Sequence, residues 1–142
     1  MTYTDVRPPI KIEGINETVI TNYFATINQE DFIATAALFA IDGELKAPFE
    51  NPIVGQKAIA NYLAKEARGM KLLPKQGTLV NEDGIDCFKV TGKVKTPLFN
   101  VHVAWYFCLN DKQEIAKARI KLLASPQELL RLKQTRENCD RS

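Results

Sequence analysis

Two aromatic side chains that each carry one hydrogen-bond donor are the most informative chemical groups in this sequence. Trp105 is the only tryptophan and lies in the strand-like run 101–109, whereas Tyr23 lies in an amphipathic segment near the N-terminus. A phenol O–H or an indole N–H combines an apolar body with a single donor, which suits a large apolar ligand carrying one acceptor. Taken alone, such residues more often serve as core aromatics than as ligand contacts.

The other reactive side chains form no recognisable catalytic or metal-binding motif. The three cysteines lack Cys-x-x-Cys spacing and His102 is the only histidine, so neither a disulfide framework nor a metal site is expected. No carboxylate is well placed to act as a catalytic base. The acidic candidates fall at predicted turns, loop edges or a short edge strand: Asp31, Asp42, Glu44, Asp83 and Asp86.

Length and composition indicate one globular domain, because 142 residues with 45% hydrophobic side chains suffice for a single core. The 19 basic and 17 acidic residues give a net charge of +2, which is too small and too scattered to indicate nucleic-acid binding. No stretch reaches the roughly 18 apolar residues of a membrane span, and the N-terminus lacks the pattern of a signal peptide. We therefore expect a cytoplasmic protein.

The order of the expected elements indicates the fold class. Asn16 is suited to cap a first helix, a second helical segment begins near Phe32, and a third ends at Gly69. A short strand over 44–47 and a turn-rich loop over 48–55 separate the second and third helices.

From residue 70 onward the hydrophobic period changes to two, which is typical of strands. A strand interrupted at Pro74 leads into a hairpin turn at 82–84, and three further strands follow over 87–95, 101–109 and 115–123. A capping box that starts at Ser125 predicts a short final helix.

These elements predict an α+β fold in which a curved antiparallel sheet forms a cone with helices on its concave face. Residues 1–14 are assigned to an N-terminal extension, residues 15–133 to the cone and residues 134–142 to a flexible C-terminal tail. One face of the last strands is basic, and it is either a solvated face or a surface that meets an acidic partner. Its residues are Lys89, Lys93, Lys95, Lys117, Arg119 and Lys121.

Several segments resemble the C-terminal domain of the cyanobacterial orange carotenoid protein, in register from residue 8 to about residue 132. They are PPIKIEG (8–14), NYF (22–24), TAALFA (35–40), APFENPIVG (47–55), KVTGKVKTP (89–97), AW (104–105) and LLASPQEL (122–129). The resemblance implies the nuclear-transport-factor-2-like cone. It points to the stand-alone homologues of that domain, which carry carotenoids as dimers.

The resemblance also implies a ligand and a site. In that family a tyrosine and a tryptophan donate hydrogen bonds to the keto oxygen of the carotenoid ring, and the matching positions here are Tyr23 and Trp105. The implied cofactor is a non-covalent keto-carotenoid of the canthaxanthin or echinenone type. Other positions on the tunnel or on the dry face of the sheet complete the expected site: Ile27, Pro48, Phe49, Met70, Leu72, Thr96, Phe99 and Phe107.

The function that the resemblance implies is that of a non-enzymatic, water-soluble carrier with a photoprotective or singlet-oxygen-quenching role. It would take up carotenoid, share one pigment between the chains of a homodimer, and exchange it with a helical carotenoid protein as donor or acceptor. Transient membrane contact is expected during uptake. Glu66 matches a position that pairs with an arginine of the family's helical domain.

Two features depart from the family pattern, and two other functions stay open. Leu98 stands where the photoactive relatives have a second tryptophan, and the segment after Phe99 is shorter than theirs, so the pocket mouth is expected to differ. The same cone supports small-molecule isomerases, dehydratases and cyclases. It also serves as a purely structural dimerisation module when its core is solid.

The cysteines suggest a further hypothesis. By strand alternation Cys87 and Cys108 are expected on the outer face of the sheet, and Cys139 lies in the tail. We expect an intermolecular disulfide through Cys108 first and Cys139 second, which would control dimerisation and pigment release by redox state. The alternative for Cys87 and Cys108 is that each is a small buried apolar residue.

Overall fold

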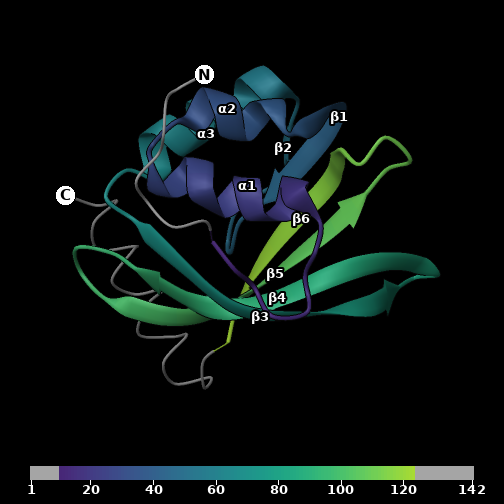
Figure 1. The fold of residues 1–142 in the computed structure, drawn as a ribbon. Helices are drawn as coiled ribbons and strands as arrows, with labels where there is room; N and C mark the ends of the chain where they lie inside the picture. Colours follow the sequence, from purple (N-terminus) through teal and green to yellow (C-terminus); the bar gives the residue numbers. More distant parts are fainter. Residues whose placement is uncertain (1–9, 124–142) are drawn as a thin grey trace, which may run out of the picture.

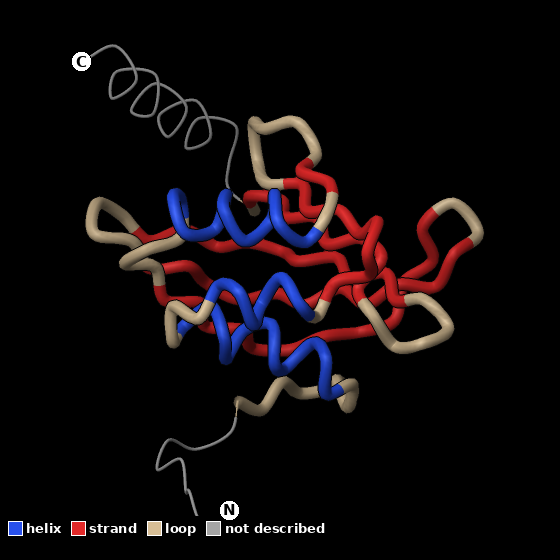
Figure 2. The backbone as a smooth tube through the Cα atoms, turned by 90° about the horizontal axis from the view of Figure 1, so that it is seen from above, coloured by secondary structure: helices blue, strands red, loops and turns tan. Residues whose placement is uncertain are grey.

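The computed structural model describes residues 10–123. Figures 1 and 2 show helices gathered on one side of a curved sheet. The helices are α1 (Thr18–Asn28), α2 (Phe32–Ala37) and α3 (Gln56–Glu66). The strands are β1 (Phe39–Lys46), β2 (Ile53–Val54), β3 (Lys71–Glu82), β4 (Ile85–Lys95), β5 (Asn100–Leu109) and β6 (Ile115–Leu122), in the order β2-β1-β6-β5-β4-β3. The predicted α+β cone is therefore confirmed.

The sheet differs in one respect from the expected antiparallel arrangement. β1 and β6 pair in parallel, with Lys46 in register with Arg119, whereas the other pairs are antiparallel. Parallel pairing is possible here because a long crossover, including α3 and four strands, separates β1 from β6 in the chain. The pairing leaves β6 in the middle of the sheet.

The expected break at Pro74 does not occur. β3 runs through this residue, and the register with β4 shifts between Pro74 and Gln76. Proline lacks an N–H, but β3 is an edge strand, where a missing donor and a bulge are tolerated.

Several element boundaries also differ from the expectations. Glu17 rather than Asn16 is the N-cap of α1, while Asp31 accepts a 3.2 Å hydrogen bond from the Ala34 N–H and caps α2. β1 begins at Phe39, earlier than expected, and β2 forms inside the segment expected to be a loop. The final helix expected from Ser125 and the tail lie outside the described residues.

The core lies between α1 and the inner face of β4 to β6. The buried residues of α1 recur at helical spacing, and they pack against alternating residues of the strands. They are Ile20, Tyr23, Phe24 and Ile27 on the helix, and Val90, Val103, Trp105 and Phe107 on the sheet. Within residues 10–123, no helix is both long enough and apolar enough to cross a membrane.

The segment before α1 packs against the free edge of β3. Ile12 is buried, and Glu13 forms a parallel bridge with Gln76. Gly14 has a φ of 87°, and a Cβ at this position would lie 2.2 Å from the carbonyl oxygen of Gly77, so only glycine fits here. This contact covers part of an edge strand that would otherwise expose unpaired backbone groups.

Candidate functional site

An apolar cavity of about 440 Å³ lies between the helices and the inner face of the sheet. Nine of the ten residues expected along a ligand tunnel line it, drawn from α1, β3, β5 and the loops at the open end. They are Tyr23, Ile27, Pro48, Phe49, Met70, Leu72, Thr96, Phe99 and Trp105. The structure therefore brings together residues that are up to 82 positions apart, from Tyr23 to Trp105.

Phe107 is the exception and does not line the cavity. Its ring packs edge-to-face against Tyr23 with a centroid distance of 4.9 Å, and it is fully buried. It shares the inner face with Trp105, as alternation predicted, but the ring of Phe24 also lies against it, at 5.7 Å. Phe107 is thus a core residue that supports Tyr23 rather than a lining residue.

Phe24 links the two donor-bearing rings. Its centroid lies 5.2 Å from that of Tyr23 and 4.7 Å from that of Trp105, in both cases edge-to-face at 85°. This geometry is favourable for aromatic pairs. Tyr23 on α1 and Trp105 on β5 are each only 1% exposed, so their positions are fixed by packing.

Neither donor has a partner among the described residues. The Tyr23 hydroxyl and the Trp105 indole nitrogen form no hydrogen bond there, although both side chains line the cavity. Neither polar atom is among the buried atoms that lack a partner, so both donors are accessible from the cavity. An acceptor atom on a ligand inside the cavity could therefore accept hydrogen bonds from them.

The phenol groups of the site stay protonated. Burial raises the pKa of Tyr23, and the neighbouring Tyr62 raises it further. Burial also raises the pKa of Tyr62, with a second contribution from Glu66. Both phenols are therefore neutral hydrogen-bond donors throughout the physiological range.

Side-chain hydrogen bonds fix the end of α1 against the start of β3. The Asn28 side chain accepts a 2.7 Å hydrogen bond from the Leu72 N–H and donates one of 2.9 Å to the Leu72 carbonyl oxygen. Glu30 accepts a 2.8 Å hydrogen bond from the Gly69 N–H. These contacts hold Leu72 and the last turn of α1, which carries Ile27, in fixed positions along the cavity.

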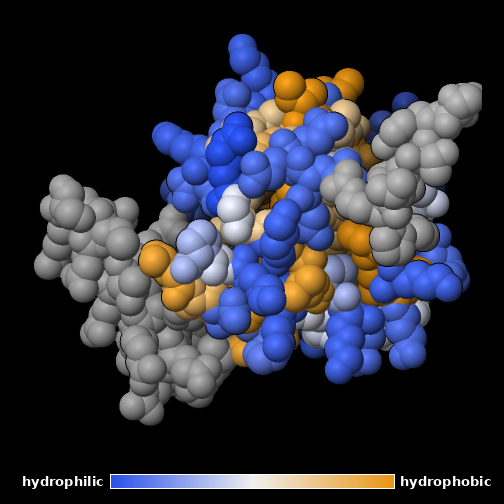
Figure 3. All heavy atoms as spheres, turned by 60° about the vertical axis from the view of Figure 1, so that its left-hand side comes forward, coloured by the Kyte–Doolittle hydropathy of each residue, from blue (hydrophilic) through white to orange (hydrophobic). Residues whose placement is uncertain are grey.

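A tight turn between β4 and β5 forms one side of the cavity mouth. Thr96 Oγ1 accepts hydrogen bonds from the Phe99 N–H (2.9 Å) and the Leu98 N–H (3.2 Å), and donates one to the Phe99 carbonyl oxygen (2.7 Å). Leu98 is 72% exposed, and Phe49, across the mouth, is 50% exposed. The space-filling view of this end of the molecule shows hydrophobic side chains at the surface among hydrophilic ones (Figure 3).

Among residues 10–123, Glu66 is the only carboxylate that lines the cavity, and it is exposed. An isomerase or dehydratase of this architecture needs an acidic base deep in the pocket. No described carboxylate occupies that place.

About half of the cavity lining was not predicted from the sequence. Strand alternation places Val94, Val101, Val103, Ile120 and Leu122 on the inner face of the sheet, together with Trp105. The helical spacing of α3 could have indicated a second group. The lining residues not named as part of the site are Leu45, Ala47, Tyr62, Leu63, Glu66, Ala67, Val94, Leu98, Val101, Val103, Ile120 and Leu122.

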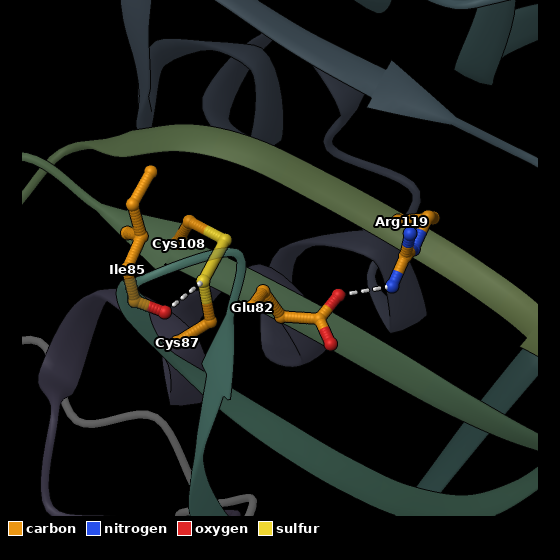
Figure 4. Close-up of polar contacts among 5 residues, drawn as sticks. All are labelled: Glu82, Ile85, Cys87, Cys108 and Arg119. Carbon is orange, nitrogen blue, oxygen red and sulfur yellow. Dashed lines mark hydrogen bonds and ion pairs between the residues drawn. A yellow bond between two sulfur atoms is a disulfide. The ribbon is translucent and has the colours of Figure 1, made fainter.

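The structure corrects the expectation for Cys108. Cys87 on β4 and Cys108 on β5 lie opposite each other on the outer face, and their sulfur atoms are joined at 2.13 Å (Figure 4). Cys108 therefore has no free thiol to link a second chain. Adjacent antiparallel strands bring directly opposite residues close together, and the Cα–Cα distance here is 4.4 Å. Because Cys108 is bonded to Cys87 of the same chain, it cannot form the expected disulfide with a second chain. Cys139 lies outside the described residues.

Comparison with known proteins identifies related chains. The chain is 41% identical over 132 residues to the orange carotenoid-binding protein of Synechocystis, a match that covers 89% of this chain and 42% of that protein. The protein of the same name from Limnospira maxima is 40% identical over 131 residues, with 89% and 41% covered. The chain thus spans about two fifths of the length of these relatives. No family model matches the chain.

Solved structures agree in fold. The orange carotenoid protein of Anabaena (Nostoc), in a structure binding canthaxanthin, superposes with a TM-score of 0.77 at 40% identity, covering 92% of this chain and 44% of that one. An NTF2-like protein from Cytophaga hutchinsonii shares the fold alone, with a TM-score of 0.59 at 14% identity, covering 85% and 99%. The chain is therefore a homologue of the C-terminal domain of the orange carotenoid protein, with the NTF2-like cone fold.

Proposed function

We propose that this protein is a non-enzymatic carrier that binds a keto-carotenoid non-covalently in the apolar cavity. The observation that carries the proposal is the pair of partnerless donors, Tyr23 and Trp105, at the wall of that cavity. A conjugated keto oxygen of the canthaxanthin or echinenone type accepts both hydrogen bonds, and the apolar lining contacts the ring and the polyene. The homology to carotenoid-binding proteins supports the same ligand.

We further propose that two chains share one pigment. A chain of this length has a radius of gyration near ~14 Å, whereas a carotenoid is about as long as the ~30 Å hydrocarbon layer of a bilayer. One cavity of about 440 Å³ therefore accommodates one ring and part of the polyene. In a homodimer joined at the cavity mouths, Tyr23 and Trp105 of each chain would hold one end of a pigment with keto groups at both ends.

The exposed apolar mouth also suggests how pigment would enter and leave. Phe49 and Leu98 would contact either a second chain or the acyl region of a membrane during uptake. The carrier would be cytoplasmic and would exchange pigment with a helical carotenoid protein, as donor or acceptor. In either role the bound pigment would quench singlet oxygen and protect against light.

Co-expression tests this proposal. The protein is produced in one host that makes canthaxanthin and in another that makes only β-carotene, and is then purified by size-exclusion chromatography with detection at pigment wavelengths. We expect a coloured dimer from the first host and little colour from the second, because β-carotene has no acceptor for the two donors. Equal loading from both hosts would contradict the role of the donors, and a fully loaded monomer would contradict pigment sharing.

A further inference from the structure

A second hollow lies where β1 and β6 separate. Their last registered pair is Lys46 with Arg119, and β6 continues to Leu122 with no further residue of β1 beside it. The hollow has a volume of about 300 Å³. Among the described residues, its lining contains three cations and no carboxylate: Lys46, Pro48, Phe49, Arg119, Ile120, Lys121 and Leu122.

Local contacts hold the three cations around this hollow. The Arg119 guanidinium lies 4.8 Å from the ring centroid of Tyr106, and Lys121 Nζ lies 5.7 Å from the same centroid. Lys46 Nζ donates a 3.1 Å hydrogen bond to the Ala47 carbonyl oxygen. Three like charges around one hollow repel one another, so a bound anion would stabilise the arrangement.

Arg119 also retains an unused donor. Its Nη2 pairs with Glu82 (Figure 4), but its Nε is buried and has no hydrogen-bond partner among the described residues. A buried donor without a partner is unusual and calls for a ligand or water. The carboxylate of β1, Glu44, is in register with Lys117 and is not among the residues that line the hollow.

The basic hollow adjoins the apolar cavity. Pro48, Phe49, Ile120 and Leu122 line both. Phe49 has a φ of 66°, an uncommon conformation for a bulky residue, and this backbone places its ring at the boundary. One elongated molecule could therefore place a charged head in the hollow and an apolar chain in the cavity.

We propose that the hollow binds the head group of an anionic amphiphile, either a long-chain carboxylate or a lipid phosphate. Lys46, Arg119 and Lys121 hold the anion, and the chain passes Phe49 into the apolar cavity. Such a ligand competes with pigment for the cavity. Only this competition rests on the proposed carotenoid function, since the anion site is defined by its own residues.

Fluorescence titration of the pigment-free protein tests the site. The probes are monomeric parinaric acid, its uncharged methyl ester, and vesicles of phosphatidylglycerol or phosphatidylcholine. The test variant is Lys46→Gln with Lys121→Gln. The matched control is Lys93→Gln with Lys117→Gln, which removes the same charge from exposed positions on the same face outside the hollow.

We expect the acid to bind about tenfold more weakly to the test variant, because charge-assisted hydrogen bonds to its head are lost. The control variant should bind like the wild type, and the ester should bind the wild type as weakly as the acid binds the test variant. If only phosphatidylglycerol vesicles bind, and the test variant abolishes that binding, the anion is a lipid head group. No binding to any anionic probe, or equal binding of acid and ester, would overturn the proposal.

The result is separable from the carotenoid test. The Lys46→Gln, Lys121→Gln variant should still bind carotenoid, because the donors Tyr23 and Trp105 are unchanged in it.

Discussion

The two faces of the sheet differ in how their polar groups are satisfied. On the concave face, Tyr23 and Trp105 hold donors that have no partner among the described residues and lie beside an apolar cavity. On the outer face, Glu82 pairs with Arg119, whose Nε has no partner among the described residues, and Cys87 is joined to Cys108. The comparison suggests that the outer contacts stabilise the sheet, whereas the inner donors are kept for a ligand. The four predictions below test this division.

The largest effect is expected from removing the ring that supports both donors. Phe24→Ala should lower the free energy of unfolding by about 3–5 kcal/mol and abolish pigment retention, because it opens a hole between Tyr23 and Trp105. Denaturant unfolding measures the first effect and visible absorption the second. Phe49→Ala, at a half-exposed residue, is the control and should cost far less stability. Equal losses in the two variants would show that Phe24 has no special supporting role.

The outer face should contribute stability without affecting the ligand. Replacing both Cys87 and Cys108 by Ser removes a cross-link between residues 21 positions apart, which should lower the free energy of unfolding by about 3 kcal/mol. The position of the pigment band should not change. Unfolding of the oxidised wild type, the reduced wild type and the variant measures the loss. Equal stability of all three would mean that the disulfide does not stabilise the fold, and a shifted band would show that the two faces are coupled.

Removing either donor should have the opposite effect: pigment binding should change, and the stability of the fold should not. Tyr23→Phe or Trp105→Phe should weaken pigment binding by about 1–2 kcal/mol each, roughly tenfold, and shift the visible band while leaving the fold intact. Tyr106→Phe on the outer face is the matched control and should change neither. Pigment titration with circular dichroism as a folding check measures these effects. An unchanged spectrum in both donor variants would show that Tyr23 and Trp105 are core residues that do not contact the ligand.

The smallest effect concerns alkaline pH. Because burial raises the pKa of Tyr23 in the folded state, the unfolded chain loses its tyrosine proton first, near the ordinary value of about 10. The resulting stability is fully present below about pH 10 and declines as the pH rises above it. Unfolding measured at several pH values should therefore show a shallower alkaline decline in Tyr23→Phe than in the wild type. Identical slopes would contradict a buried, neutral phenol.

Much of the fold follows from local patterns in the sequence. The apolar spacing of α1 and the alternation along β4 and β5 predicted these three elements and the face that each buries. The parallel pairing of β1 with β6 was not predictable, because it depends on contacts between strands about 70 residues apart. The passage of β3 through Pro74 was also missed, since tolerance of proline depends on the strand being at the edge of the sheet.

Prediction of the site from the sequence was limited in the same way, because local patterns do not give contacts between distant residues. Alternation placed Trp105 on the inner face, but it could not distinguish a residue that lines a cavity from one that fills the core, as the contrast with Phe107 shows. Alternation also placed Cys87 and Cys108 on the outer face. Alternation does not predict the register between two strands, however. The register of β4 with β5 is what brings Cys87 and Cys108 opposite each other.

The most direct test of the central claim is the visible absorption of the Tyr23→Phe, Trp105→Phe double variant, purified beside the wild type from a canthaxanthin-producing host. Both proteins should fold, since each substitution keeps an aromatic side chain at its position, although Trp105→Phe replaces the indole by a smaller ring. We expect a strongly coloured wild type and a variant that retains roughly a hundredth of the binding affinity, because two hydrogen bonds to the keto oxygen are lost. Equal pigment content and an identical spectrum in the two proteins would contradict the account.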